Sequence, residues 1–159
     1  MTLQTGDKLP EGKVKKMGAE GPEEVTLHSL LAGKKIALFG VPGAFTPGCH
    51  KTHLPGYVAN ADSIKDKGFD DIICLAVNDV YVMDAWGNAS GAAGKVTMVA
   101  DGSAKLTKAM GLELDLTNVG MGLRCKRFSM VVNDGVVESI NIDAKSIDAT
   151  TAENTCGLN

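Results

Sequence analysis

The 159-residue chain lacks several features that would assign it to a large class of proteins. Basic residues are not in excess, since 16 Lys and Arg stand against 19 Asp and Glu, and nucleic-acid binding normally needs clustered positive charge. No apolar run approaches the roughly 18 residues of a membrane-spanning helix. Internal repeats and linkers rich in Pro, Gly and Ser are also missing. We therefore expect a single domain over residues 1–159 that binds neither nucleic acid nor membranes.

Cysteine is sparse and widely spaced, at positions 49, 74, 125 and 156, and no C-x-x-C occurs. This spacing counts against a zinc ribbon, a thioredoxin-type dithiol and the dense disulfide frame of a small secreted domain. Met1 to Glu11 show no cationic segment followed by an apolar stretch, which a signal peptide would need. We expect a reducing, cytoplasmic setting, and an organellar mature form is also compatible with the sequence.

The middle of the chain alternates predicted strands and helices. Residues 11–24 are polar and glycine-rich, which is typical of a hairpin or loop. Short apolar runs indicate buried strands at Ile36–Gly40, Asp71–Val77 and Val96–Ala100. Apolar spacing and capping residues predict helices after Thr26, over Leu54–Lys67, after Asn78 or Asp79, over Ser103–Met110 and over Thr151–Asn159.

A β-hairpin is predicted in the last third of the chain. Phe128–Val132 and Val136–Ile142 flank Asn133-Asp134-Gly135, which is a strong turn signal. Together with the preceding alternation, this hairpin predicts an α/β fold. We expect a central mixed β-sheet flanked by helices and mostly parallel in its first part.

The loop after the first predicted central strand is the best placed for chemistry, because ligands collect beyond the carboxyl ends of strands in open α/β sheets. Thr46 is a good N-cap and Pro47 suits the first helical position, which puts Cys49 inside the first turn. Free N–H groups and the helix dipole favour a thiolate there and offer donors to substrate oxygens. On this placement alone, a packing role for Cys49 is equally compatible with the sequence.

A longer string around this loop resembles a known family. Residues 42–49 read P-G-A-F-T-P-G-C, and the P-x-x-x-T-x-x-C spacing is the active-site motif of peroxiredoxins. The next string, H-K-T-H-L-P-G at residues 50–56, is similar to the peroxiredoxin-5-like, or type II, branch. Likeness to this branch continues in order at residues 76–79, 82–86, 100–102 and 126–130. The resemblance covers most of the chain.

This resemblance implies a thioredoxin-like fold and a thiol-dependent peroxidase that needs no bound cofactor. Cys49 would attack the O–O bond of hydrogen peroxide or an alkyl hydroperoxide and become a sulfenic acid. Thr46 would hydrogen-bond the thiolate and the peroxide oxygen, Pro42 would shield the site from water, and Arg127 would lie beside the sulfur. The fixed donors of an arginine suit the negative charge that develops on the leaving oxygen. The resemblance further implies a homodimer and reduction by thioredoxin or by glutathione with glutaredoxin.

Neighbouring residues have less specific assignments. Gly48 and His53 are candidates for substrate binding, and we expect His53 to line or order the pocket. His50 and His53 form H-x-x-H beside Cys49, but this tight spacing lacks the separated ligand pairs of zinc sites, so we expect no metal. Arg124 lies outside the matched strings and is expected to be solvated.

The sequence leaves open how the sulfenic acid is resolved. Cys156 lies near the chain end, where mobility is common, but its surroundings do not match the G-L-T-C string of animal relatives. Cys74 lies in a predicted buried strand and would reach Cys49 only after local unfolding. A one-cysteine cycle with an external thiol is the third alternative. The alternative function is a redox sensor that uses oxidation of Cys49 to change its contacts.

Overall fold

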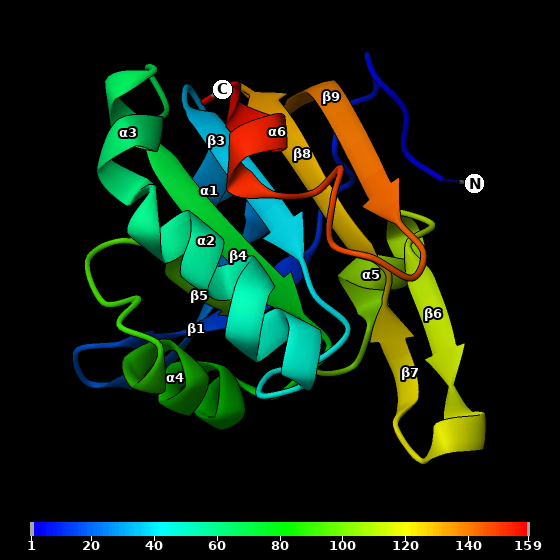
Figure 1. Cartoon of the computed structure of the whole chain (residues 1–159). Coiled ribbons are helices and arrows are strands. Elements are labelled where there is room, and N and C mark those ends of the chain that lie inside the picture. The colour runs from blue at the N-terminus through cyan, green and yellow to red at the C-terminus, as the bar shows by residue number, and fades with distance from the viewer. Residues whose placement is uncertain (1, 159) are drawn as a thin grey trace.

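The computed structural model describes residues 2–158 and is built on a seven-stranded β-sheet (Figure 1). The strand order is β2-β1-β5-β4-β3-β8-β9. Strands β3, β4 and β5 run parallel, and all other neighbours pair antiparallel, which confirms the predicted mixed sheet. The strands of this sheet are β1 (Lys13–Gly18), β2 (Gly21–Thr26), β3 (Lys35–Gly40), β4 (Asp71–Ala76), β5 (Thr97–Ala100), β8 (Arg127–Asn133) and β9 (Val136–Asp143).

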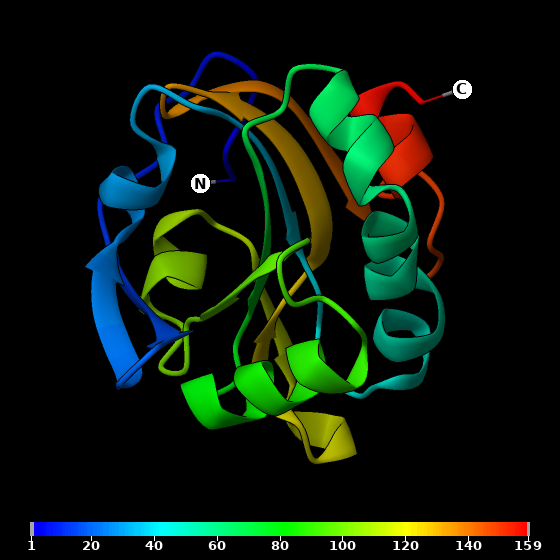
Figure 2. The same ribbon diagram turned by 90° about the vertical axis from the view of Figure 1, so that its left-hand side faces the viewer.

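Helices cover both faces of the sheet (Figures 1 and 2). Buried residues of α2, α3, α4 and α6 belong to the core layer on one face, and those of α1 and α5 to the layer on the other. A π-helical turn, η1 (Cys49–His53), leads directly into α2. The helices are α1 (Leu27–Leu31), α2 (Leu54–Ala59), α3 (Ala61–Asp66), α4 (Val80–Ala89), α5 (Lys105–Ala109) and α6 (Ala152–Cys156).

The central strands are buried on both sides, which explains their continuous apolar sequence. Along β3, Ala37 and Phe39 point into the layer under α2, whereas Ile36 and Leu38 point into the layer under α1. All four side chains are at most 1% exposed. The strand therefore forms the middle of the core and carries the following loop to the edge of the sheet.

The predicted hairpin and the predicted caps of α1 and α4 are confirmed, whereas the hydroxyl of Thr46, also predicted as a cap, donates to the carbonyl of Gly43. Asp134 and Gly135 both have positive φ angles, 48° and 81°, as a tight two-residue turn between β8 and β9 requires. The side chains of Thr26, Asp79 and Thr151 each accept a backbone N–H in the first turn of α1, α4 and α6.

The single helix predicted over Leu54–Lys67 is wrong, because the segment breaks at Asn60 into α2 and α3. The side-chain amide of Asn60 donates to the carbonyl of Gly56 at 2.7 Å, and its backbone N–H donates to the same carbonyl. This local bond competes with the regular helical pattern and leaves Asn60 at φ −100° and ψ 9°.

A second, two-stranded sheet was not predicted. It pairs β6 (Glu113–Leu116) with β7 (Gly122–Cys125) antiparallel, joined through the 3₁₀ turn η2 (Thr117–Val119). Each strand has only four residues, and the connecting turn is polar, so the strand signal in the sequence is short. This hairpin extends away from the main sheet next to the start of β8 (Figure 1).

Gly40 ends β3 directly before the loop that carries Cys49, and Phe128 lies opposite it in β8. A Cβ at residue 40 would overlap the fully buried ring of Phe128. We expect Gly40→Ala to lower the free energy of unfolding by about 1–3 kcal/mol, measured by urea unfolding. Gly56→Ala in α2 is the matched control, since its added Cβ meets nothing within 4 Å. That control should be neutral or stabilising by up to about 1 kcal/mol, and equal stability of the two variants would contradict the packing described.

Candidate active site

One end of the sheet brings together the last residues of β3 and β9 and the first residue of β8. Strand β3 ends at Gly40, and β8, which is antiparallel to it, begins at Arg127. Strand β9 ends at Asp143, the register partner of Arg127. Because neighbouring antiparallel strands place one strand's end beside the other's start, the loop after β3 lies next to Arg127. This pairing brings Cys49 and Arg127 together across 78 positions of sequence.

The loop between β3 and η1 is held by hydrogen bonds within the loop and by one to Asn78, which lies outside it. The backbone N–H and the hydroxyl of Thr46 both donate to the carbonyl of Gly43, at 3.3 and 2.6 Å. Asn78, which follows β4, accepts from the N–H of Ala44 at 2.9 Å. Phe45 has a φ of 62°, a left-handed conformation that is uncommon for a residue other than glycine. These bonds therefore hold a strained turn in place beside the sulfur.

Cys49 lies near the start of the helical segment, as predicted, and its side chain is 0% exposed. Arg127 reaches it from β8, and Nη2 of Arg127 donates to Sγ of Cys49 at 3.3 Å. Within residues 2–158, the guanidinium has no Asp or Glu oxygen within 4.0 Å. A thiolate at Cys49 is therefore the negative group that this half-buried charge can stabilise directly.

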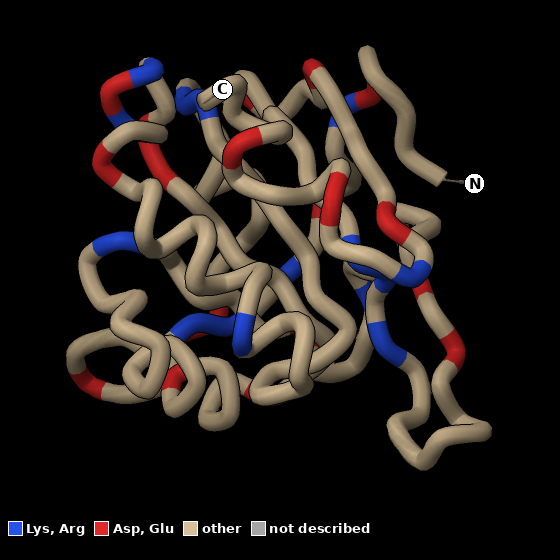
Figure 3. Tube along the Cα trace, viewed as in Figure 1, with Lys and Arg blue, Asp and Glu red and all other residues tan. Residues whose placement is uncertain are grey.

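A cavity of about 740 Å³ is lined by Gly48, the residue before Cys49, and by Arg127, whose guanidinium contacts the sulfur. Its other walls include the apolar side chains of Pro42, Leu114, Ile142 and Ile147 and the amines of Lys126 and Lys145. Basic segments gather around the start of β8 and beyond the end of β9 (Figure 3). A Cβ at Gly48 would lie 3.1 Å from Ile147 and 3.3 Å from Nη2 of Arg127, so a larger residue would crowd the guanidinium.

His53 connects Arg127 to the C-terminal part of the chain. Its Nε2 lies 3.0 Å from the carbonyl of Thr150, and its Nδ1 lies 2.9 Å from Nη1 of Arg127. A carbonyl only accepts and a guanidinium only donates, so Nε2 must carry the proton and Nδ1 must accept. Burial, followed by the positive charge of Arg127, lowers the pKa of His53 from 6.5 to about 4. His53 is therefore a neutral hydrogen-bond acceptor that orients the arginine.

The other three thiols are held in the protonated form. Burial raises the pKa of Cys125 and of Cys156 to about 12, and it raises the pKa of Cys74 well above its usual value. The thiol of Cys125 also donates to the carbonyl of Val41 at 3.0 Å, which requires its proton. Among the hydrogen bonds within residues 2–158, Cys49 is the only cysteine whose sulfur accepts from an arginine. Cys49 is therefore the cysteine whose surroundings can stabilise a thiolate directly.

The structure gathers Pro42, Thr46, Gly48, Cys49, His53 and Arg127 at this edge. Cys156 lies elsewhere, lining a cavity with Lys35 and Phe69 beside the start of β3. The hydroxyl of Thr46 was expected to hydrogen-bond the thiolate, but its proton goes to the carbonyl of Gly43. Its oxygen lone pairs are what remains for a substrate.

Sequence reasoning missed the role of Arg124, which was expected to be solvated. The residue is half-buried, its Nε donates to the carbonyl of Met121 at 2.9 Å, and its Nη1 donates to the carbonyl of Pro42 at 3.3 Å. Arg124 thus clamps the loop that precedes Cys49. Arg124 lies in β7, outside the matched strings, and its acceptors are backbone carbonyls, so no sequence signal marked it.

His50 and His53 point to different partners, although they share the H-x-x-H string. Nδ1 of His50 accepts from Nε1 of Trp86 at 3.1 Å, whereas both ring nitrogens of His53 are engaged as described above. In the described part of the chain, no three His, Cys, Asp or Glu residues are placed to hold a metal ion. Over the same residues, no helix has the length and apolar character needed to span a bilayer.

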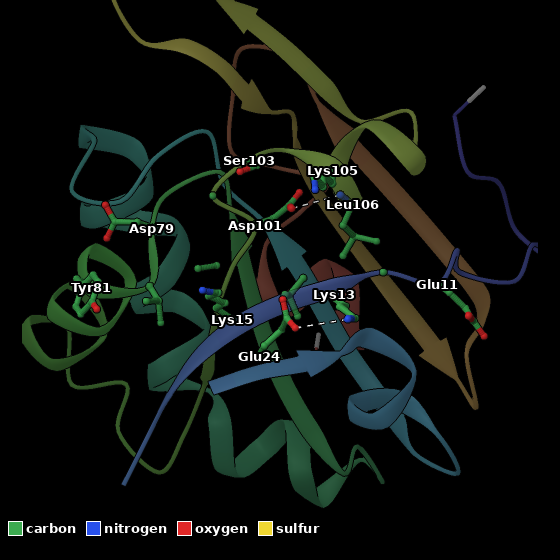
Figure 4. Close-up of a pocket in the computed structure, with 15 residues that line it drawn as sticks. Glu11, Lys13, Lys15, Glu24, Asp79, Tyr81, Asp101, Ser103, Lys105 and Leu106 are labelled. Carbon is green, nitrogen blue, oxygen red and sulfur yellow. Dashed lines mark hydrogen bonds and ion pairs between the residues drawn. The ribbon is translucent and has the colours of Figure 1, made fainter. Parts of the chain in front are cut away.

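A second cavity, of about 550 Å³, lies between the β1–β2 hairpin, the start of α4 and the β5–α5 connection (Figure 4). Some of the charged residues that line this cavity are paired within the chain. Lys13 lies 3.6 Å from Glu24, and the carboxylate of Asp101 accepts both the N–H and the hydroxyl of Thr107 at 2.7 Å. The residues that line it include none of those expected in catalysis. This cavity is therefore separate from the one lined by Gly48 and Arg127.

A mixed sheet of this topology, with a cysteine near a helix start beyond a parallel strand and an arginine on its sulfur, is typical of thioredoxin-like thiol oxidoreductases. The Redoxin family model matches residues 4–155. Peroxiredoxin-2C of Arabidopsis thaliana is 43% identical over 143 residues, which cover 89% of this chain and 88% of that protein. This chain belongs to the peroxiredoxins and is a thiol-dependent peroxidase.

Solved structures agree with this family. The reduced Prx3 from Vibrio vulnificus in complex with hydrogen peroxide has a TM-score of 0.94 and 43% identity, covering 99% of both chains. The antioxidant protein of Plasmodium falciparum, a 1-Cys peroxiredoxin, has a TM-score of 0.87 and 32% identity, covering 96% of this chain and 95% of that one. The resemblance inferred from the loop and its flanking strings is thereby confirmed.

The neutral state of His53 predicts a specific loss of stability in acid. Because the folded pKa of about 4 lies below the ordinary 6.5, the unfolded chain binds the proton first as the pH falls. The contribution of His53 to the free energy of unfolding is complete above pH 6.5. It declines between pH 6.5 and 4, by about 2 kcal/mol at pH 4.5. Urea unfolding from pH 7 to 4.5 should show this slope in the wild type and a smaller slope in His53→Gln. His28 and His50 are common to both proteins and cancel in the difference, and parallel curves would contradict a buried neutral His53.

Proposed function

We propose that Cys49 is the peroxidatic residue and that it reduces hydrogen peroxide and alkyl hydroperoxides. The observation that carries this assignment is the 3.3 Å contact from Nη2 of Arg127 to Sγ of Cys49. A hydroperoxide is small and nearly neutral, so the enzyme must supply an activated thiolate and donors for the departing oxygen. The cavity lined by Gly48 and Arg127 provides space for a hydroperoxide at that point.

In the proposed reaction, the Cys49 thiolate attacks the terminal oxygen of the hydroperoxide and forms an S–O bond while the O–O bond breaks. Sulfur is oxidised by two electrons to a sulfenic acid, and the leaving alkoxide or hydroxide takes a proton to become an alcohol or water. Arg127 stabilises the negative charge as it moves from sulfur to the leaving oxygen. Thr46, whose proton is committed to Gly43, offers a lone pair to the O–H of the incoming hydroperoxide.

Arg127→Ala removes the donor from the sulfur and the partner of His53 together. We expect the oxidation of Cys49 by hydrogen peroxide to slow by roughly 10- to 1,000-fold, the usual effect of losing one preorganised donor. Rapid-mixing fluorescence of Trp86 measures this step in a single turnover. Lys51→Ala is the matched control, because it removes an exposed positive charge from the same turn and should change the rate by less than about twofold. Wild-type kinetics in Arg127→Ala would overturn the proposed role.

We propose that an external thiol, either thioredoxin or glutathione with glutaredoxin, reduces the sulfenic acid. Supporting this, Cys156 packs beside the start of β3, whereas Cys49 follows its far end, and five residue steps of a strand span about 17 Å. Cys74 shares the core layer of Cys49 but is 0% exposed within β4. A relative with a TM-score of 0.87 is described as a 1-Cys peroxiredoxin. The alternatives, resolution by Cys156 or by Cys74, need larger rearrangements.

Intact mass after one equivalent of hydrogen peroxide tests the attacking and the resolving residue together. Wild type, Cys74→Ser and Cys156→Ser should each gain one oxygen atom, and Cys49→Ser should gain none and lose turnover, because serine gives no thiolate at neutral pH. A product that lacks two hydrogens and disappears in one serine variant would identify that cysteine as the resolver. Oxidation without turnover in the presence of thiol donors would instead favour the redox-sensor function.

We further propose a homodimer and a cytoplasmic setting. Phe45, in the loop before Cys49, and Tyr81, in the first turn of α4, are 48% and 66% exposed. The two elements are adjacent, because Asn78 binds the loop immediately before α4 begins. Exposed aromatic rings on neighbouring elements suit a contact with a second copy. The four free, buried cysteines suit a reducing compartment.

A further inference from the structure

Asp143 is a half-exposed residue with several hydrogen bonds that the proposed mechanism does not yet use. It ends β9 opposite Arg127, but its carboxylate turns away to the segment that follows β9. Oδ2 accepts from the N–H of Asp148 at 3.0 Å and from the N–H and hydroxyl of Thr150 at 2.9 and 2.7 Å, and Oδ1 accepts from the N–H of Ala149 at 3.3 Å. Burial alone would raise the pKa of Asp143, but these hydrogen bonds outweigh it and hold that pKa below its usual value.

These four bonds fix the turn that presents the carbonyl of Thr150. That carbonyl accepts from Nε2 of His53 at 3.0 Å and from the hydroxyl of Tyr57 at 2.8 Å, so both of its lone pairs are used. Tyr57 is fully buried and its ring stacks on that of Phe39, with ring centroids 3.9 Å apart. The carbonyl is therefore held between a rigid core residue on one side and the turn organised by Asp143 on the other.

The same bonds prevent a competing contact. Arg127 and Asp143 are direct neighbours across β8 and β9, where a carboxylate with free lone pairs would attract the guanidinium. An Arg127–Asp143 ion pair would draw positive charge away from the sulfur of Cys49. Because four hydrogen bonds hold the carboxylate toward the turn, more than 4.0 Å from the guanidinium, Arg127 binds the neutral His53 and the sulfur instead.

We propose that Asp143 is a positioning residue for the peroxidase reaction. It acts in series, through the Thr150 carbonyl and the Nε2–H tautomer of His53, to keep the guanidinium of Arg127 on the sulfur of Cys49. This inference rests on the proposed function only in taking Cys49 as the residue that reacts. Asp143 lines the same cavity as Arg127, but its carboxylate is bound to the turn, so its proposed role is to position other groups.

A double-mutant cycle with Asp143→Asn and Arg127→Ala tests this series. Asparagine keeps the shape of the side chain but replaces one accepting oxygen with a donor, so part of the turn loses its anchor. With Arg127 present, we expect Asp143→Asn to slow oxidation of Cys49 by hydrogen peroxide on the order of tenfold, less than the loss of a whole preorganised donor. In the Arg127→Ala background, the same substitution should change the rate by less than about twofold.

Asp148→Asn is the matched control, because it removes a carboxylate from the same turn while Asp148 joins the network through its backbone. It should leave the rate within about twofold of wild type. If Asp143→Asn unfolds near the assay temperature, Thr150→Val removes one of the four bonds and keeps the carbonyl. Thr150→Val should slow the oxidation of Cys49 less than Asp143→Asn does. This slowing should likewise vanish in the Arg127→Ala background.

Alkylation of the reduced proteins by iodoacetamide, located at Cys49 by peptide mass, gives a readout that needs no peroxide. It should show the same dependence on Arg127, since it reports the nucleophilicity of the sulfur. Equal slowing by Asp143→Asn in both backgrounds, or no slowing in either, would overturn the positioning role. Failure of the proposed function appears differently, as wild type that alkylates rapidly at Cys49 but is not oxidised there by hydrogen peroxide.

Discussion

The active site depends on one charge-assisted hydrogen bond, from the guanidinium of Arg127 to the sulfur of Cys49. Because Cys49 is sealed from solvent, a thiolate there loses the hydration that would stabilise it in water. The guanidinium replaces that hydration, and it is available because its other contact, His53, is neutral. A carboxylate in place of His53 would compete for the same charge. The electrostatics of the site therefore require a neutral acceptor at this position, which a histidine with a lowered pKa supplies.

The sequence predicts best those elements whose residues are buried on both faces or capped by a local side chain. The strands β3 and β4 are continuous apolar runs, and Asp79 and Thr151 cap their helices through bonds to residues three positions away. The elements that sequence reasoning missed depend on weaker signals. The helix break at Asn60 arises from one side-chain amide, and β6 and β7 are too short to show a strong alternation.

For the site, the sequence identifies side chains but not the groups that orient them. Cys49, Thr46 and Arg127 were found through their motif strings, and the antiparallel pairing of β3 with β8 explains why strings so far apart converge. The role of the Thr150 carbonyl could not be predicted, because every residue carries a carbonyl and only the fold decides which one contacts His53. The same holds for the hydroxyl of Thr46, since its choice of Gly43 as acceptor depends on the conformation of the turn.

The network that orients Arg127 also bears on how the oxidised sulfur is reduced. Helix α6, which carries Cys156, is tied to the site through Thr155, whose hydroxyl lies between those of Tyr57 and Ser129. Moving Cys156 to Cys49 would require undocking α6, and that would pull on the Thr150 carbonyl that holds His53. Such a movement would dismantle the arginine contact in every cycle and require its reassembly before the next attack. An external thiol also requires the buried sulfur of Cys49 to become accessible, but it does not require α6 to undock, so the Thr150 carbonyl can stay in place. This difference supports the proposed reduction from outside the chain.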